Sequence, residues 1–134
     1  MKPFNLLIAF IGLSINRVSA TCFFSGAKWN NRTAARMHAF SACKGDGVNR
    51  GLFQVEFAAK QKITTCVQYS ATQRFVFTIE NRGVEKPTKL DQDHCVGGLH
   101  HEILECARGG SSKSGQWVFR ADPNKGFCEE ARPK

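Results

Sequence analysis

The chain has 134 residues and a net charge of +8, with 19 lysines and arginines against 11 aspartates and glutamates. No apolar run is long enough to span a bilayer, which excludes a transmembrane helix. We therefore expect a soluble protein that is released from the membrane on secretion. The basic charge favours attraction to acidic surfaces, but it selects none of them, because a moderate net charge also keeps ordinary proteins in solution.

The first twenty residues predict a secretory signal peptide. Lys2 supplies a positive charge, "FNLLIAFIGLSI" is an apolar stretch of suitable length, and "VSA" ends in the small-x-small pattern that precedes cleavage. We expect cleavage after Ala20, which removes Lys2 and Arg17 and lowers the net charge from +8 to +6. The predicted product is a single secreted, extracellular domain of residues 21–134.

Six cysteines lie in this expected domain. An even number behind a signal peptide predicts a small cysteine-rich protein with three disulfides in an oxidising compartment. No two cysteines have the C-x₂₋₄-C spacing of a zinc knuckle. Six cysteines allow fifteen pairings, and the sequence does not choose among them. The cysteines are Cys22, Cys43, Cys66, Cys95, Cys106 and Cys128.

A short strand and a helix are predicted first in chain order. The aromatic stretch "CFFSGAKW" favours a strand from residue 22 to about residue 25. Asn30 or Asn31 can cap a helix that runs to about Lys44. Asn31 also begins an Asn-Arg-Thr sequon, which predicts a glycoprotein with a surface glycan at this position.

Three strands follow, because "LFQVEF" (52–57), "ITTCVQY" (63–69) and "RFVFTIE" (74–80) alternate apolar and polar residues with a period of two. "QWVFRA" (116–121) alternates in the same way near the end of the chain, and "DPNKG" (122–126) predicts a turn after it.

"LDQDHCVGGLHHEILECARGG" (90–110) predicts a second helix before that last strand, with Asp91 and Asp93 suited to its start and Gly109 just past its end. Gly97 and Gly98 in mid-helix cost about 1 kcal/mol each relative to alanine, so we expect a close approach to the sheet or to the other helix. The order β-α-β-β-(β)-α-β, with one wet sheet face, predicts an α/β (α+β) two-layer sandwich. It has two helices on a mostly antiparallel sheet of four to five strands.

The histidines of the second helix do not have the spacing of a metal site. Glu105 stands where a His-Glu-x-x-His motif needs its second histidine. His94 and His101 are about 10.5 Å apart along a helix axis, which is too far for one metal ion. We therefore expect no metal, and we interpret the line of His94, Gly98, His101 and Glu105 along this helix as a solvated polar face. A small ribonuclease using His38, His94 and Glu56 has no local motif behind it, so no catalytic residue is assigned.

Several stretches resemble one known family: "CFFSGAKW", "FSACKG", "GLFQVEF", "LDQDHCVGGLHHEILECARGG" and "GQWVFRADPNKGFC". Together they are similar to a fungal secreted glycan-binding protein family of the mushroom lectin type, with a Y-three-like domain. The resemblance runs from Cys22 to Cys128. It implies a compact α/β domain that binds carbohydrate, with no enzyme activity and no cofactor.

The first functional hypothesis is therefore a secreted fungal, lectin-like glycan-binding protein that acts as an effector on a host. Its expected partner is a glycan, a glycoprotein or another host cell-surface component, with no nucleic acid. The alternative is a killer-toxin-like or virulence effector that acts through a protein or membrane contact, and the ribonuclease is the third.

The ligand site is expected at strand ends and on the polar sheet face, because rigid scaffolds present binding residues there. We expect the first and last strands to be neighbours, which would bring the loop of residues 26–30 beside the predicted turn. Trp29 has an alternative role as a packing residue at the start of the first helix. The expected ligand-binding residues are Trp29, Lys28, Tyr69, Arg74, Arg120, Asp122 and Asn124.

Overall fold

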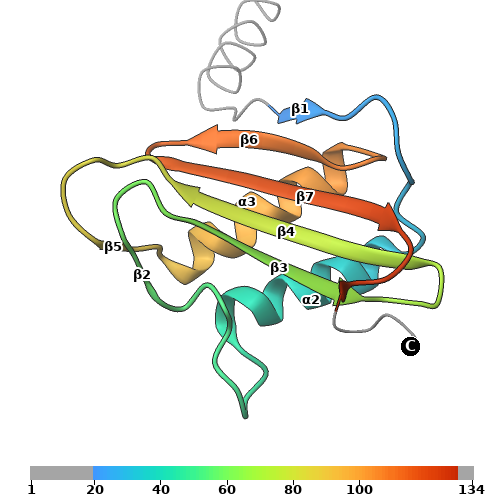
Figure 1. The fold of residues 1–134 in the computed structure, drawn as a ribbon, viewed down its shortest axis with the longest axis horizontal. Coiled ribbons are helices and arrows are strands. Elements are labelled where there is room, and N and C mark those ends of the chain that lie inside the picture. The colour runs from blue at the N-terminus through green and yellow to red at the C-terminus, as the bar shows by residue number, and fades with distance from the viewer. Residues whose placement is uncertain (1–19, 130–134) are drawn as a thin grey trace, which may run out of the picture.

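The computed structural model describes residues 20–129, in which one layer of helices packs against a five-stranded antiparallel sheet (Figure 1). The sheet order is β1-β6-β7-β4-β3, and β2 and β5 form a separate two-stranded sheet. The elements are β1 (Ala20–Cys22), α2 (Arg32–Lys44), β2 (Glu56–Phe57), β3 (Lys62–Gln68), β4 (Gln73–Asn81), β5 (Thr88–Lys89), α3 (Gln92–Glu105), β6 (Gly110–Ser114) and β7 (Trp117–Lys125). The predicted α+β class, with two helices on a mostly antiparallel sheet, is confirmed.

The predicted signal peptide lies outside the described residues, apart from Ala20, which is the first residue of β1. No helix between residues 20 and 129 has both the length and the apolar character needed to cross a membrane.

Period-two alternation on the central strands creates the core. Phe75, Phe77 and Ile79 of β4 are buried under the helices, and Phe119 and Ala121 of β7 pair with Ile79 and Phe77 on the same face. The helices contribute the apolar residues that meet them, which are Ala35, Ala39, Leu99 and Ile103. Neither α2 nor α3 covers the other sheet face, and no other helix is found within residues 20–129 (Figure 1); we call this face the open face.

Both helices begin where capping residues predict. The Asn31 side chain accepts a hydrogen bond from the backbone N–H of Ala34 at 2.9 Å, and Asp91 accepts one from His94 at 3.0 Å. Asn31 is exposed, and its glycosylation stays a prediction. The second helix ends earlier than predicted, at Glu105, and Gly109 adopts its positive φ of 82° in the turn that leads to β6.

Three predicted strand boundaries are wrong. The first strand is Ala20–Cys22 and stops before residue 25. Of "LFQVEF", only Glu56–Phe57 is a strand, because Phe53 is instead drawn into the core, where its N–H donates to the Ala42 carbonyl at 3.0 Å. The "DPNKG" segment is not a turn, since β7 continues through Pro123 to Lys125. Proline is tolerated there because β6 pairs with β7 only as far as Ala121, so this end of β7 is an edge.

The strand β6 was not predicted, and it changes the topology. Its sequence, GSSKS, lacks the apolar alternation that indicates a strand. It lies between β1 and β7, so the first and last strands are not neighbours as expected.

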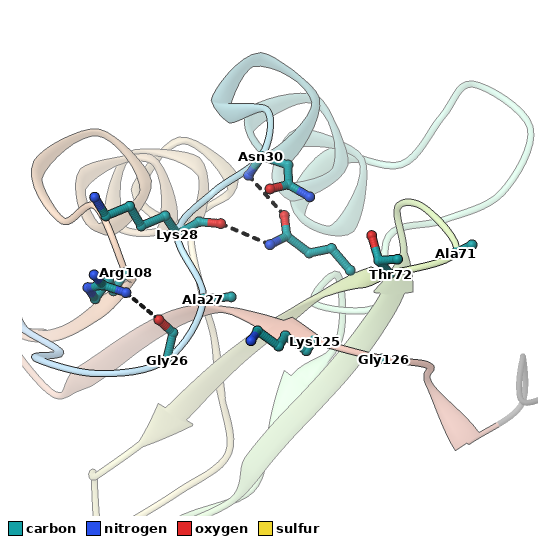
Figure 2. A pocket seen from close by; sticks show the side chains of 10 residues that line it. Gly26, Ala27, Lys28, Asn30, Ala71, Thr72, Arg108, Lys125 and Gly126 are labelled. Carbon is teal, nitrogen blue, oxygen red and sulfur yellow. Dashed lines mark hydrogen bonds between the residues drawn. The ribbon is translucent and has the colours of Figure 1, made fainter.

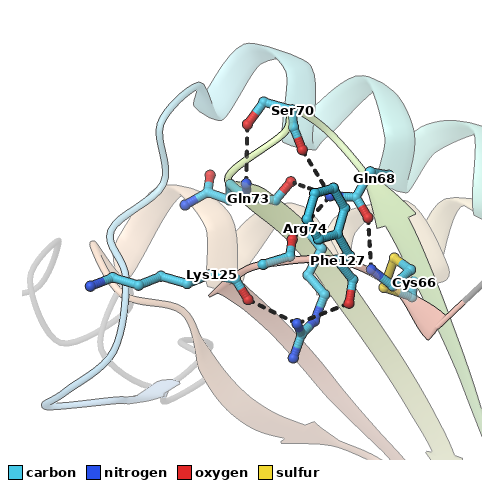
Figure 3. The surroundings of a disulfide bond; sticks show 9 residues. Cys66, Gln68, Ser70, Gln73, Arg74, Lys125 and Phe127 are labelled. Atoms are coloured by element: carbon cyan, nitrogen blue, oxygen red, sulfur yellow. Dashed lines mark hydrogen bonds between the residues drawn. A yellow bond between two sulfur atoms is a disulfide. The ribbon is translucent and has the colours of Figure 1, made fainter. Parts of the chain in front are cut away.

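All six cysteines form disulfides, which confirms the predicted number, and no described cysteine is free. Cys22–Cys106 joins β1 to the end of α3, and Cys43–Cys95 joins the two helices. Cys66–Cys128 joins β3 to the segment that follows β7 (Figure 3).

The close approach expected at the glycine pair occurs at Gly98. A Cβ atom there would lie 2.5 Å from the ring of Phe119, whereas a Cβ at Gly97 would meet nothing within 4 Å. The missing side chain of Gly98 therefore lets α3 rest directly on β7.

We expect Gly98→Ala to lower the free energy of unfolding by about 1–3 kcal/mol, because the added methyl overpacks a rigid ring. The matched variant Gly97→Ala should raise it by about 0.5–1 kcal/mol, because alanine is the better helix former and its methyl has room. Urea unfolding of both variants measures the difference. Equal stability of the two would contradict the contact with Phe119.

Candidate ligand-binding sites

The sheet separates the predicted site residues into two groups. Arg74, Arg120, Asp122 and Asn124 lie together on the open face, because Arg74 pairs with Asn124, Val76 with Asp122 and Thr78 with Arg120 in the β4–β7 register. Lys28, Trp29 and Tyr69 lie on the helix side, so no single surface contains all seven residues.

The three charged residues predicted at the site on the open face, Arg74, Arg120 and Asp122, already contact other parts of the chain. The Arg74 guanidinium donates from Nη1 to the carbonyls of Lys125 at 2.8 Å and Phe127 at 3.2 Å (Figure 3). Arg120 lies over the ring of Phe23 at 4.5 Å and contacts Asp122 at 3.4 Å. These contacts tie the end of β7 and the segment after β1 to the sheet.

Of the two aromatic residues predicted to bind ligand, Trp29 is part of the core and Tyr69 packs against it. The side chain of Trp29 is only 8% exposed, its Nε1–H donates to the Cys106 carbonyl at 2.9 Å, and its ring lies 5.4 Å from Phe75. Tyr69 is half-buried against this cluster, and its ring stacks on Phe75 at 5.0 Å with an angle of 17° between the rings. Trp29 therefore has the packing role and offers no open ring face to a sugar.

A polar hollow of about 700 Å³ lies where the loop after β1, the β3–β4 hairpin and the end of β7 meet (Figure 2). Three cations line it, namely Lys28, Arg108 and Lys125, and no acidic residue is found among the described residues of its wall. We call it the basic hollow. Its lining residues are Gly26, Ala27, Lys28, Asn30, Ala71, Thr72, Gln73, Arg108, Lys125 and Gly126.

The loop of residues 26–30 is held rigidly beside this hollow. Gln73 is 2% exposed, and its side chain donates to the Lys28 carbonyl at 2.9 Å while accepting from the Asn30 N–H at 3.0 Å. Arg108 donates to the Gly26 carbonyl, and the Trp29 N–H donates to the Ala107 carbonyl at 3.1 Å. The hollow is thus preorganised by contacts with buried or backbone groups (Figure 2).

The sequence predicted the loop but not its partners. Lys28 was expected at the site, whereas Arg108, Lys125 and Gln73 were not. Lys125 stood inside the segment predicted to be a turn, and Arg108 inside the predicted second helix. Only the pairing of Gln73 with Lys125 across β4 and β7 brings these elements to one place.

A second cavity, of about 320 Å³, lies between α3 and β6, and we call it the α3–β6 pocket. His94 and His101 line it and are half-buried, so the predicted solvated polar face is wrong for these two residues, whereas Glu105 on the same line is exposed. The Nε2 atom of His94 is 3.0 Å from the hydroxyl of Ser114. The lining residues are Asp93, His94, Gly97, Gly98, His101, Ser112, Ser114 and Phe119.

Glu102 lies behind this pocket and is fully buried. The Ser112 hydroxyl donates to its Oε2 atom. Burial raises the pKa of Glu102 above its ordinary value, and the hydrogen bond from Ser112 and the charge of His101 oppose the rise only in part.

The raised pKa predicts that stability falls as pH increases. Between the unfolded-state and folded-state pKa values of Glu102 the folded protein binds more protons, so the free energy of unfolding decreases with pH in this window. Glu102→Gln should remove this pH-dependent loss of stability. At pH values above the folded-state pKa of Glu102, the variant should therefore melt a few degrees higher than the native protein. Thermal melts of both proteins from pH 4 to 9 measure it, and parallel profiles would contradict the assignment.

Residues 20–129 contain no group of three or more His, Cys, Asp or Glu residues placed to hold a metal ion. The catalytic set considered from sequence is not gathered in one place. His38 contacts Phe75 in β4. His94 contacts Phe119 in β7, and Phe119 pairs with Ile79, which is four residues from Phe75 along β4. The two histidines therefore lie at different places along the sheet. Glu56 lies in the separate two-stranded sheet.

The fold and its cavities together define a three-disulfide α+β domain with a basic hollow at its strand ends and a second pocket between α3 and β6. The chain matches no protein-family model and no curated protein.

Proposed function

We propose that the protein is a secreted carbohydrate-binding protein that recognises an anionic glycan in the basic hollow. The observation that carries this proposal is the grouping of Lys28, Arg108 and Lys125 around one hollow without an acidic residue in its described wall. Such a grouping attracts carboxylate or sulfate groups, which occur in glycans as uronic acids and sulfate esters.

The remaining lining suits sugar hydroxyls. Asn30 and Thr72 provide amide and hydroxyl groups that can donate and accept hydrogen bonds. Arg108 uses one guanidinium nitrogen to hold the Gly26 carbonyl, and its fork has five N–H donors in all, so it can contact an anion as well. Since the loop is already fixed by Gln73, little ordering entropy opposes binding.

The three disulfides and the predicted signal peptide support secretion. The partner proposed on this basis is an extracellular glycan or glycoprotein, such as a component of a host cell surface on which the protein acts as an effector.

Binding of the oxidised protein to an array of neutral and anionic glycans tests the proposal, followed by titration of the strongest ligand. Lys28→Glu and Lys125→Glu should each weaken binding at least tenfold, which corresponds to about 1.4 kcal/mol. Lys113→Glu is the matched control, because Lys113 is exposed in β6 and pairs with Val118 on the open face. It makes the same change of charge away from the hollow.

Affinity for the glycan should also fall as the salt concentration increases, because exposed charge contacts are screened. A preference for neutral glycans, or equal binding by all three variants, would contradict the proposal. If the protein bound a protein partner, and only Lys113→Glu abolished this binding, the binding surface would be the open face and not the basic hollow.

A further inference from the structure

The α3–β6 pocket has the opposite chemistry to the basic hollow. Its polar groups are the Asp93 carboxylate, two serine hydroxyls and two imidazoles, and no lysine or arginine occurs among its described lining residues. Gly97, Gly98 and Phe119 form the apolar part of its wall. The pocket is therefore rich in hydrogen-bond acceptors and suits a ligand that brings donors and positive charge.

Two buried atoms beside the pocket have no hydrogen-bond partner among residues 20–129. They are Nε2 of His101, a lining residue, and Oε1 of Glu102, whose other oxygen accepts from the lining residue Ser112. A buried polar atom without a hydrogen-bond partner costs about 1–3 kcal/mol. A ligand that formed hydrogen bonds with these two atoms would recover this cost as binding free energy.

We propose that the α3–β6 pocket binds a small organic ammonium ion. Its N–H groups donate to the Ser112 hydroxyl and to Nε2 of His101, its apolar part lies against Gly97 and Gly98, and Glu102 provides the buried counter-charge. This site is independent of the proposed glycan function.

No lysine or arginine among residues 20–129 takes that place beside Glu102. On its own helix, His101 is adjacent and Asp93 lies at the pocket. From α2, Lys44 pairs with Asp93 at 2.5 Å and Arg32 donates to the Ile103 carbonyl at 2.9 Å. The strands present the uncharged residues Cys22, Ser112 and Phe119 to α3, because Lys113 and Arg120 alternate to the open face.

Ligand binding should therefore be coupled to proton release. An ammonium ion next to the Glu102 carboxyl stabilises its ionised form, and the proton leaves to the buffer. Affinity for the cation should rise with pH, while affinity for an uncharged ligand of the same shape should not.

Calorimetric titration with benzylamine, which is a cation throughout this range, and with benzyl alcohol at pH 5 and pH 8 tests the proposal. Benzylamine should bind about tenfold more tightly at pH 8 than at pH 5, with proton release detected from the buffer dependence of the enthalpy. Benzyl alcohol should bind more weakly and without this pH dependence.

Glu102→Gln should weaken benzylamine binding at least tenfold and remove the pH dependence, and Ser112→Ala provides a second variant if the first fails to fold. Lys125→Glu, in the basic hollow, should leave benzylamine binding unchanged while it weakens glycan binding. Equal affinity for the amine and the alcohol, pH-independent amine binding, or full binding by folded Glu102→Gln or Ser112→Ala protein would overturn the proposal.

Discussion

Trp29→Ala is expected to lower the free energy of unfolding by about 3–5 kcal/mol, the usual cost of deleting a buried aromatic ring. The ring contacts Phe75, and its Nε1–H satisfies the Cys106 carbonyl, so the substitution leaves both a cavity and an unpaired acceptor. Chemical unfolding at neutral pH measures the loss.

Two further variants separate the contributions at this position. Trp29→Phe keeps an aromatic ring but removes the donor, so it should cost less than Trp29→Ala. Phe24→Ala is the control, since Phe24 is 98% exposed in the same loop and its loss should change stability by no more than about 0.5 kcal/mol. A Trp29→Ala protein as stable as Phe24→Ala would show that Trp29 is not a core residue.

The double variant Cys43→Ala/Cys95→Ala is expected to lose about 2–5 kcal/mol of stability, as when a native disulfide is removed from a small secreted domain. This bond closes a separation of 52 residues and is the covalent link between α2 and α3, and both cysteines are buried in the core. Thermal and urea unfolding of the double variant measure the effect.

The matched comparison is Cys66→Ala/Cys128→Ala, which removes a bond over a similar separation of 62 residues. Cys66 is only half-buried, so its removal should cost less packing energy than the loss of the helix–helix bond. Peptide mapping of the unreduced protein should show the three pairs described above and no alkylated cysteine. A larger loss from the Cys66→Ala/Cys128→Ala protein would contradict this ranking.

The parts of the fold that followed from periodicity were predictable. Asn31 and Asp91 marked the starts of the helices, and the alternation in β3, β4 and the first half of β7 marked the central strands. Local patterns suffice there because each element buries one face, and that face appears in the sequence as a repeat of 2 or 3.6 residues. The glycine pair in α3 likewise predicted a close contact, which Gly98 makes with Phe119.

The strand β6 shows where local patterns fail. Its five residues carry no apolar face, and they become a strand because β1 and β7 supply backbone partners on both sides. Pro123 and Asn124 have the composition of a turn but are held extended by β4. In both cases hydrogen bonds to residues distant in the sequence outweigh local preference.

The sequence by itself determined the helices, the central strands, the number of disulfides and the basic charge, because each depends on composition or on neighbours along the chain. Only the tertiary structure decided which cysteines pair, that Trp29 is buried, and that Lys28, Arg108 and Lys125 surround one hollow. It also decided that Glu102 is buried behind Ser112. These features depend on the order of strands in the sheet, which brings together residues as far apart as 97 positions, from Lys28 to Lys125. No local sequence pattern predicts the order of the strands, because this order depends on the packing of the whole domain.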